Sequence, residues 1–255
     1  MVGVATPLFP FYAEYAPVFG ADPQVWPGGQ ERICNGTPGA SDKKGDDMTA
    51  PTAGLLRPPR RKGMMGAQTV LPMVAAIERS FGPAVVAQLL DEARFARLPE
   101  HGEHVRERQV AILHQALRRQ YPEQAESIQR EAARDAVEWI MQNRIPARAR
   151  LLLSGMPWAM AVWMLGRHAA QNAWAFGGSG RFELLSTSEF QLTDNPLIRG
   201  EHSTHAICAW HEELFQQTFR RMAHSRLRCT EASCMAAGAD ACRFRLVMEP
   251  VRAGA

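Results

Sequence analysis

Apolar residues recur at helical spacing along the chain from Leu71 to about residue 176. In the first segment they fall three or four residues apart, and a Gly82-Pro83 break divides that segment into two short helices. The glycine-rich run at 177–180 ends the helical part of the chain. The spacing predicts helices on either side of Gly82-Pro83 and then over residues 105–120, 123–143, 147–153 and 158–176.

Beyond residue 180 the apolar positions alternate, as in strands with one buried face. Residues 181–186 and 189–193 predict a hairpin that turns at Thr187-Ser188. A helix capped by Ser203 or Thr204 follows, and the strands 226–231 and 242–247 then pair around a long tongue, residues 232–241. This order predicts an α+β fold, in which N-terminal amphipathic helices pack with a small antiparallel sheet.

Residues 1–66 show neither period and hold 9 of the 17 prolines and 10 of the 20 glycines. We expect a disordered tail there, a folded domain over 67–249 and a short tail at 250–255. An alternative for residues 1–66 is a start codon placed too early, because Met48, Met64 and Met65 precede the first helix. The tail lacks the basic start and apolar run of a secretory signal, so a cytoplasmic location is expected.

Charge and motifs exclude several classes of function. The 29 Lys and Arg residues against 26 Asp and Glu residues give a net charge of +3, far below the basic excess of proteins that bind by neutralising phosphates. Nucleic acid is therefore not the expected partner. The sequence contains neither a Walker A loop nor a Gly-x-Gly-x-x-Gly turn, so it offers no recognisable nucleotide cradle.

The most apolar stretch, Leu151 to Gly166, is uncharged but interrupted by Gly155 and Pro157. It is shorter than the roughly 20 residues that cross a bilayer, which favours a buried helix over a transmembrane segment. Its large polarizable side chains are typical of pockets for flat apolar ligands, and ordinary core packing is the alternative. These side chains are Met156, Trp158, Met160, Trp163 and Met164.

Four cysteines in the last quarter of the chain point to a metal. Cys208, Cys229, Cys234 and Cys242 fall close together in a sequence without features of a secreted protein, where metal binding is the usual reason for such a cluster. Three thiolates and the Glu231 carboxylate would fill a tetrahedral Zn²⁺ site and leave no open position, so the zinc would be structural. Alternation puts Cys229 on the strand face of Glu231, and Cys229 is the rival fourth ligand. Reduced cysteines in a core are the remaining alternative.

A resemblance to a known family rests on the run Glu231-Ala-Ser-Cys-Met-Ala-Ala-Gly-Ala-Asp-Ala-Cys-Arg-Phe244, with Cys208 upstream. This run resembles the signature of the V4R (4-vinyl reductase) domain family, which includes sensors of aromatic ligands and is similar in fold to small vesicle-tethering subunits. The segments 144–146, 156–158, 167–168 and 173–180 resemble its bacteriochlorophyll-biosynthesis members, over about residues 70–249. The resemblance implies a zinc-pinned C-terminal hairpin, with a zinc motif in 208–246 and the ligands Cys208, Glu231, Cys234 and Cys242.

The resemblance also implies a function. The activity associated with these members is reduction of a vinyl group on a chlorophyll precursor, which needs a hydride or electron donor, and the sequence shows no motif for one. We therefore expect a carrier or accessory protein that binds a Mg-tetrapyrrole or protochlorophyllide-type intermediate. The reductase itself is the first alternative, a sensor of small aromatic ligands is the second, and no residue is assigned a catalytic role. The expected ligand-binding residues are Met156, Trp158, Met160, Trp163, Met164, His168, Trp174 and Phe176.

The last expectations concern the roles of four histidines and the partners of this chain. His168 is a candidate axial ligand to the pigment's Mg, or else a hydrogen-bonded core residue. His202, His205 and His211 are expected on a solvated helix face, and the alternative for His211, one turn from Cys208, is a hydrogen bond beside the metal ligands. The amphipathic helices from Leu71 to Gln120 predict a homodimer, and other pigment-biosynthesis enzymes are candidate partners.

Overall fold

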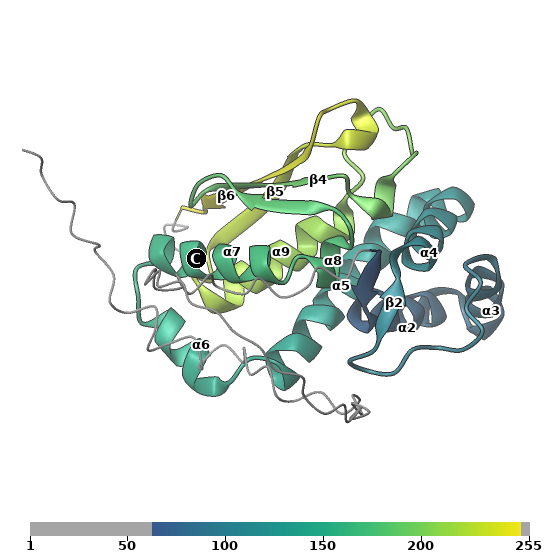
Figure 1. Ribbon diagram of the computed structural model, residues 1–255, viewed down its shortest axis with the longest axis horizontal. Helices are drawn as coiled ribbons and strands as arrows, with labels where there is room; N and C mark the ends of the chain where they lie inside the picture. Colours follow the sequence, from purple (N-terminus) through teal and green to yellow (C-terminus); the bar gives the residue numbers. More distant parts are fainter. Residues whose placement is uncertain (1–62, 251–255) are drawn as a thin grey trace, which may run out of the picture.

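The structure, a computed structural model, describes residues 63–250, and the predicted tails at 1–62 and 251–255 lie outside the described residues. The described elements are β1 (Met64–Gly66), η2 (Ala67–Thr69), α2 (Leu71–Phe81), α3 (Pro83–Glu92), β2 (His104–Arg106), α4 (Glu107–Gln120), α5 (Pro122–Asn143), α6 (Ala147–Ser154), α7 (Trp158–Gln171), α8 (Trp174–Gly177), β3 (Arg181–Leu184), β4 (Glu189–Thr193), η3 (Pro196–Ile198), α9 (Ala209–Met222), β5 (Leu227–Ser233), η4 (Met235–Ala237) and β6 (Cys242–Met248). Helices α2 to α4 gather at one end of the molecule, and the sheet of β3 to β6 lies at the other (Figure 1).

The predicted break between the first two helices is confirmed. Gly82 has φ +81°, a backbone conformation that favours glycine, and Pro83 begins α3. The next helix begins at Glu107, two residues later than predicted, because Val105 pairs with Met65 in a two-stranded antiparallel sheet. Residues 64–66 were expected in the tail, and they form the other strand of this sheet.

The apolar helix predicted over 158–176 is confirmed as far as Gln171, and its predicted continuity to residue 176 is wrong. It ends at Gln171, where the Asn172 side-chain amide donates to the His168 carbonyl oxygen at 3.0 Å, and the separate short helix α8 follows. No helix within residues 63–250 combines the length and apolar character needed to cross a membrane. The uncharged stretch is divided at Gly155–Pro157 into α6 and α7.

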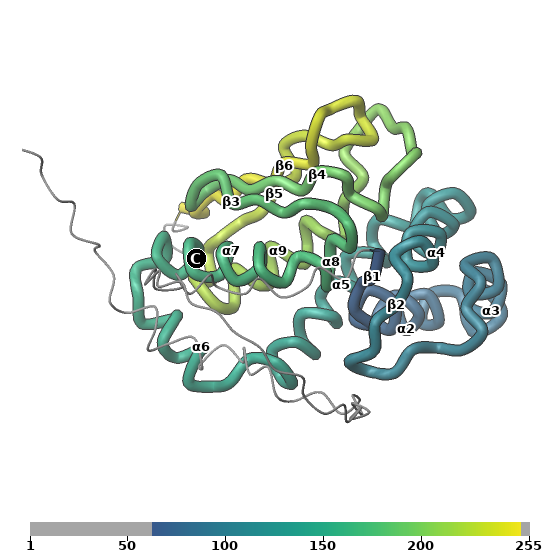
Figure 2. The backbone as a smooth tube through the Cα atoms, viewed as in Figure 1, coloured from purple at the N-terminus to yellow at the C-terminus, as the bar shows by residue number. Residues whose placement is uncertain are grey.

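The two predicted hairpins form one antiparallel sheet in the order β3-β4-β6-β5. Phe190 of β4 lies opposite Phe244 of β6, and the two buried rings stack with centroids 5.6 Å apart. Helices α7 and α9 lie beneath one face of this sheet, with β3 at the edge above α7 (Figure 2). The fold is thus the mixed arrangement of helices and a small antiparallel sheet that the sequence predicts.

The last helix begins at Ala209, later than the predicted caps. Ser203 does not cap it, since its hydroxyl accepts from the His205 N–H at 3.2 Å and its own N–H donates to the Ala236 carbonyl. Cys208 occupies the N-cap position. The start of α9 is therefore set beside the tongue between β5 and β6.

Candidate functional site

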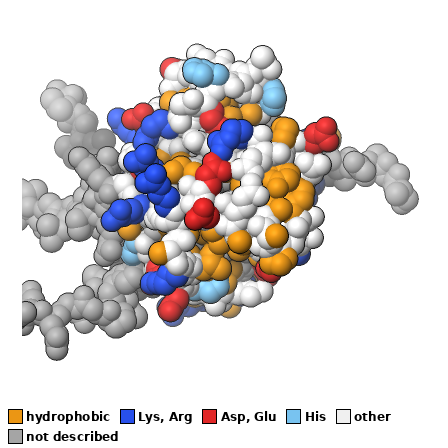
Figure 3. Space-filling view, turned by 90° about the vertical axis from the view of Figure 1, so that its right-hand side faces the viewer, with side chains coloured by type: hydrophobic (Ala, Val, Ile, Leu, Met, Phe, Trp, Pro, Cys, Tyr) orange, Lys and Arg blue, Asp and Glu red, His pale blue; other side chains and the backbone are white. Residues whose placement is uncertain are grey.

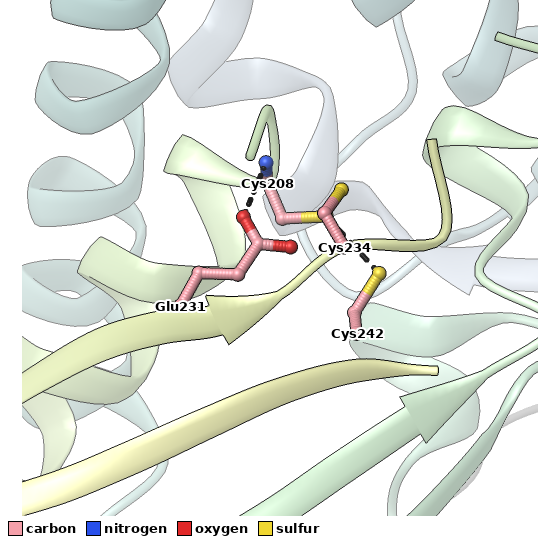
Figure 4. Close-up of side chains that lie close together, drawn as sticks. All are labelled: Cys208, Glu231, Cys234 and Cys242. Atoms are coloured by element: carbon pink, nitrogen blue, oxygen red, sulfur yellow. Dashed lines mark hydrogen bonds between the residues drawn. The ribbon is translucent and has the colours of Figure 1, made fainter. Parts of the chain in front are cut away.

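Four predicted metal ligands converge where α9 begins and the β5–β6 hairpin opens. Cys208 precedes α9, Glu231 lies on β5, Cys234 follows β5 and Cys242 begins β6 (Figure 4). Their three sulfur atoms and one carboxylate oxygen all lie within 4.8 Å of one another. Cys208 Sγ lies 3.4 Å from Cys242 Sγ and 3.9 Å from Cys234 Sγ.

This geometry fits a metal ion. Two sulfurs bound tetrahedrally at about 2.3 Å from Zn²⁺ lie roughly 3.8 Å apart, close to the two sulfur–sulfur distances observed. Glu231 Oε2 accepts from the Cys208 N–H at 2.9 Å. Glu231 Oε1 is buried and has no hydrogen-bond partner among residues 63–250, as expected of an oxygen that ligates a cation.

The pKa values of the cluster residues also favour a bound cation. Burial raises the pKa of Glu231 to about 8. A hydrogen bond with Cys234, together with burial, raises the pKa of Cys208 well above its usual range. Hydrogen bonds from Cys208 and Cys242 hold the pKa of Cys234 far below its usual range. The cluster by itself therefore favours a single thiolate, and a divalent cation would compensate the charge of the remaining ligands.

Cys229, the rival fourth ligand, lies outside this group. It is buried on β5 opposite Leu246, and its N–H donates to Gln216 Oε1 at 3.2 Å. Alternation places Cys229 and Glu231 on one strand face. Of these two, Glu231 lies close to the three cysteines of the cluster.

Two polar residues lie next to the cluster, and only one of them, His211, is named in the sequence analysis. Asn195 is fully buried and its Nδ2 lies 3.5 Å from Cys208 Sγ. His211 is 1% exposed, so its expected place on a solvated helix face is wrong, whereas His202 and His205 are exposed as predicted. Burial lowers the pKa of His211 to about 4, so its imidazole is neutral at neutral pH.

The candidate ligand residues on α7 and just before it are partly exposed apolar side chains, and Leu151 of α6 is an exposed apolar residue nearby in the sequence. Met160 is 40% exposed and Leu151 of α6 is 76% exposed. We call this group the α7 surface. The other members are half-buried, and they are Met156, Trp158, Trp163 and Met164.

The buried side of α7 is formed by small and branched residues. Gly166 packs so closely on Leu184 of β3 that an added Cβ would lie 2.7 Å from Leu184 Cδ1. This contact leaves little space between α7 and β3 at this point. Within the α7 surface, Met156, Trp158 and Met164 pack against the hydrophobic core, and Met160 is exposed.

The three remaining candidates have different surroundings. Trp174 lies against His104 of β2 with tilted rings whose centroids are 4.6 Å apart, and Phe176 lies edge-on to Phe182 and Phe215 in the aromatic core. His168, on α7 itself, is half-buried, and burial lowers its pKa. Trp174 thus faces β2, whereas Phe176 packs α8 against the sheet.

Comparisons with known proteins identify the family. A model described as V4R domain matches residues 189–248, the segment that contains all four cluster residues. A bacteriochlorophyll synthase 23 kDa chain from Cereibacter sphaeroides is 33% identical over 202 residues, which cover 78% of this chain and 98% of that protein. A protein of the same name from Rhodobacter capsulatus is 28% identical over 71% of this chain and 86% of its own length.

Among solved structures, an H-NOX protein from K. algicida in the Fe(II) unliganded state is similar with a TM-score of 0.50. The match covers 75% of this chain and 100% of that one at 11% identity, so the likeness concerns the fold alone. The relative from Cereibacter sphaeroides is matched over nearly its whole length. Residues 189–248 of the chain match the V4R domain. The chain therefore belongs to the family of bacteriochlorophyll synthase 23 kDa chains.

Proposed function

We propose that this chain binds a Mg-tetrapyrrole or protochlorophyllide-type intermediate and acts as a carrier or accessory factor in bacteriochlorophyll biosynthesis. Membership of a family whose relatives are named as chains of a bacteriochlorophyll synthase supports a role in that pathway. The same relatives make other pigment-biosynthesis enzymes the proposed recipients of the pigment.

The observation that carries the proposal is the α7 surface. Met160 and Leu151 are large apolar residues left substantially exposed, and α7 also carries two half-buried indoles, Trp158 and Trp163. Exposed apolar surfaces of this kind mark binding sites, and aromatic and thioether side chains suit a broad flat ring. Each aromatic contact contributes on the order of 1 kcal/mol beyond area burial.

Trp163 is the proposed stacking residue. The Arg167 guanidinium lies over one face of its indole, 5.2 Å from the ring centroid. This cation offers a positive charge beside the proposed stacking position. We propose that Trp174 and His168 extend the contact toward α8, with His168 as a candidate axial ligand to the pigment's Mg.

We further propose that the Cys208, Glu231, Cys234 and Cys242 cluster holds a structural Zn²⁺. The donor set of three thiolates and one carboxylate is one that zinc accepts, and four protein ligands leave no open position for substrate. The ion would supply no chemistry to the pigment. These residues would instead fix the start of α9 to the β5–β6 hairpin.

A fluorescence titration tests the pigment proposal. Binding of a protochlorophyllide-type pigment to the α7 surface should quench tryptophan emission, and Trp163→Ala should weaken the affinity about fivefold to tenfold. The matched control is Trp139→Ala on α5, where the indole stacks on His101. Equal affinities for all three proteins would contradict the assignment of Trp163, and absence of binding would contradict the proposed function.

A further inference from the structure

The amide of Asn195 links the metal cluster to His211. Its Nδ2 lies 3.5 Å from Cys208 Sγ and 3.4 Å from His211 Nδ1, while its Oδ1 accepts from the Leu197 N–H at 3.1 Å. An amide nitrogen carries two hydrogens, so it can make both contacts at once. Since Asn195 is 0% exposed, these three bonds fix its orientation.

His211 continues the link to α8. Its Nε2 lies 3.0 Å from the carbonyl oxygen of Phe176. A carbonyl only accepts hydrogen bonds, so these partners assign the proton of the neutral imidazole to Nε2 and leave Nδ1 to accept from Asn195. The same tautomer therefore satisfies both neighbours.

The Phe176 carbonyl needs this donor. It belongs to the last turn of α8, where backbone carbonyls lack a partner inside the helix. The Phe176 ring is held edge-on by Phe182 and Phe215, and the Trp174 ring of the same short helix lies tilted against His104. A single buried hydrogen bond from α9 thus helps to hold the element that carries Trp174.

We propose that Asn195 and His211 are positioning residues that couple the metal centre to α8. Metal ligation fixes the position of Cys208 Sγ, which is the acceptor for Asn195, and Asn195 in turn orients His211 toward the Phe176 carbonyl. Occupancy of the centre then determines how firmly α8 and Trp174 are held. The consequence for pigment binding rests on the proposed function, whereas the coupling itself does not.

Hydrogen exchange of the full zinc-loaded chain, read by mass spectrometry, tests this coupling. His211→Phe keeps a ring beside Phe215 and removes both hydrogen bonds. We expect exchange of the amides at 173–180 to rise on the order of tenfold, with unchanged zinc content and unchanged exchange in α5. His211→Gln, which retains a donor and an acceptor, should restore most of the protection. His202→Phe, at an exposed histidine, is the matched control.

Chelation of the zinc provides a second test of the coupling. Removing zinc should raise exchange at 173–180 by a larger factor than in α5 in the wild-type chain, and in His211→Phe the excess at 173–180 over α5 should be no more than about twofold. Unchanged exchange of α8 in zinc-loaded His211→Phe would overturn the coupling. Equal loosening of α5 and α8 would also overturn it, because His211 would then be a general packing residue. A chain that shows the expected exchange but binds no pigment would keep the coupling and lose the proposed function.

Discussion

Gly166 of α7 lies directly against Leu184 of β3, with room for no side chain at the glycine. A Cβ there would lie 2.7 Å from one Leu184 methyl carbon and 2.9 Å from the other. We predict that Gly166→Val lowers the free energy of unfolding by about 1–3 kcal/mol, because the Leu184 side chain or α7 itself must move to accommodate it. Ala170→Val, at an exposed position of the same helix, should change it by less than about 0.5 kcal/mol. Urea denaturation of both variants checks this, and equal stabilities would contradict the close packing.

The metal proposal predicts a clear difference between the cysteines. Purified protein should contain about one Zn²⁺ per chain, and Cys242→Ala should lose the metal and at least about 5 kcal/mol of stability, since binding energy at a structural site is folding energy. Cys229→Ser should keep the metal. Elemental analysis and X-ray absorption check these outcomes, with three sulfurs and one oxygen expected around the ion. A shell of four sulfurs would identify Cys229 rather than Glu231 as the fourth ligand. Metal-free protein with an unchanged melting temperature would contradict the metal site.

Stability should fall in mild acid because of a buried histidine. His114 is 0% exposed, and burial, with a smaller effect of Arg118, lowers its pKa from 6.5 to about 3. Between these pH values the unfolded chain binds a proton that the folded chain does not. Stability present above pH 6.5 is therefore lost as the pH falls toward 3, at up to about 1.4 kcal/mol per pH unit.

Two variants isolate this contribution from acid release of metal. Unfolding free energies measured between pH 7 and 5 should depend less steeply on pH in His114→Gln than in the wild-type chain. A glutamine can still donate to the Thr69 carbonyl, which His114 Nε2 contacts at 3.2 Å. His202→Gln, at an exposed position, should leave the slope unchanged. Parallel curves for His114→Gln and the wild type would contradict the assignment.

The sequence predicts the parts of this molecule that follow from local pattern. Apolar spacing located the break at Gly82-Pro83 and both hairpins of the sheet. It could not locate the end of α7 at Gln171, because apolar residues continue through Phe176 and only the Asn172 side chain marks the break. Contacts between distant segments decide such boundaries.

The same limit holds at the candidate metal centre. Alternation put Cys229 and Glu231 on one strand face and left both open as ligands. A register shift between Glu231 and Ser233 interrupts the β5–β6 ladder beside the cluster, and alternation cannot show such an irregularity. Asn195 could be interpreted only as part of a loop, because its contacts with Cys208 and His211 span 13 and 16 residues of sequence.

We predict a homodimer through the α2–α4 end of the molecule. Hydrophobic side chains gather on this end in Figure 3, and Pro83, Ala84 and Ala87 of α3 are exposed. Light scattering should give about twice the chain mass of 28.3 kDa. Ala87→Glu should shift the protein to monomer, since it places a charge on the paired face, and Ala170→Glu on α7 should not. A wild-type monomer at micromolar concentration would contradict this interface.

The central claim is that the chain binds the pigment without reducing it. Reduction of a vinyl group to an ethyl group adds a hydride and a proton, so the product carries two more hydrogen atoms than the substrate. The direct measurement is mass spectrometry of a divinyl Mg-tetrapyrrole recovered after anaerobic incubation with stoichiometric protein and NADPH, with binding followed by the absorption spectrum. We predict a shifted spectrum, quenched tryptophan emission and a recovered pigment of unchanged mass. Binding together with a mass gain of two hydrogens would contradict the carrier account and establish the reductase.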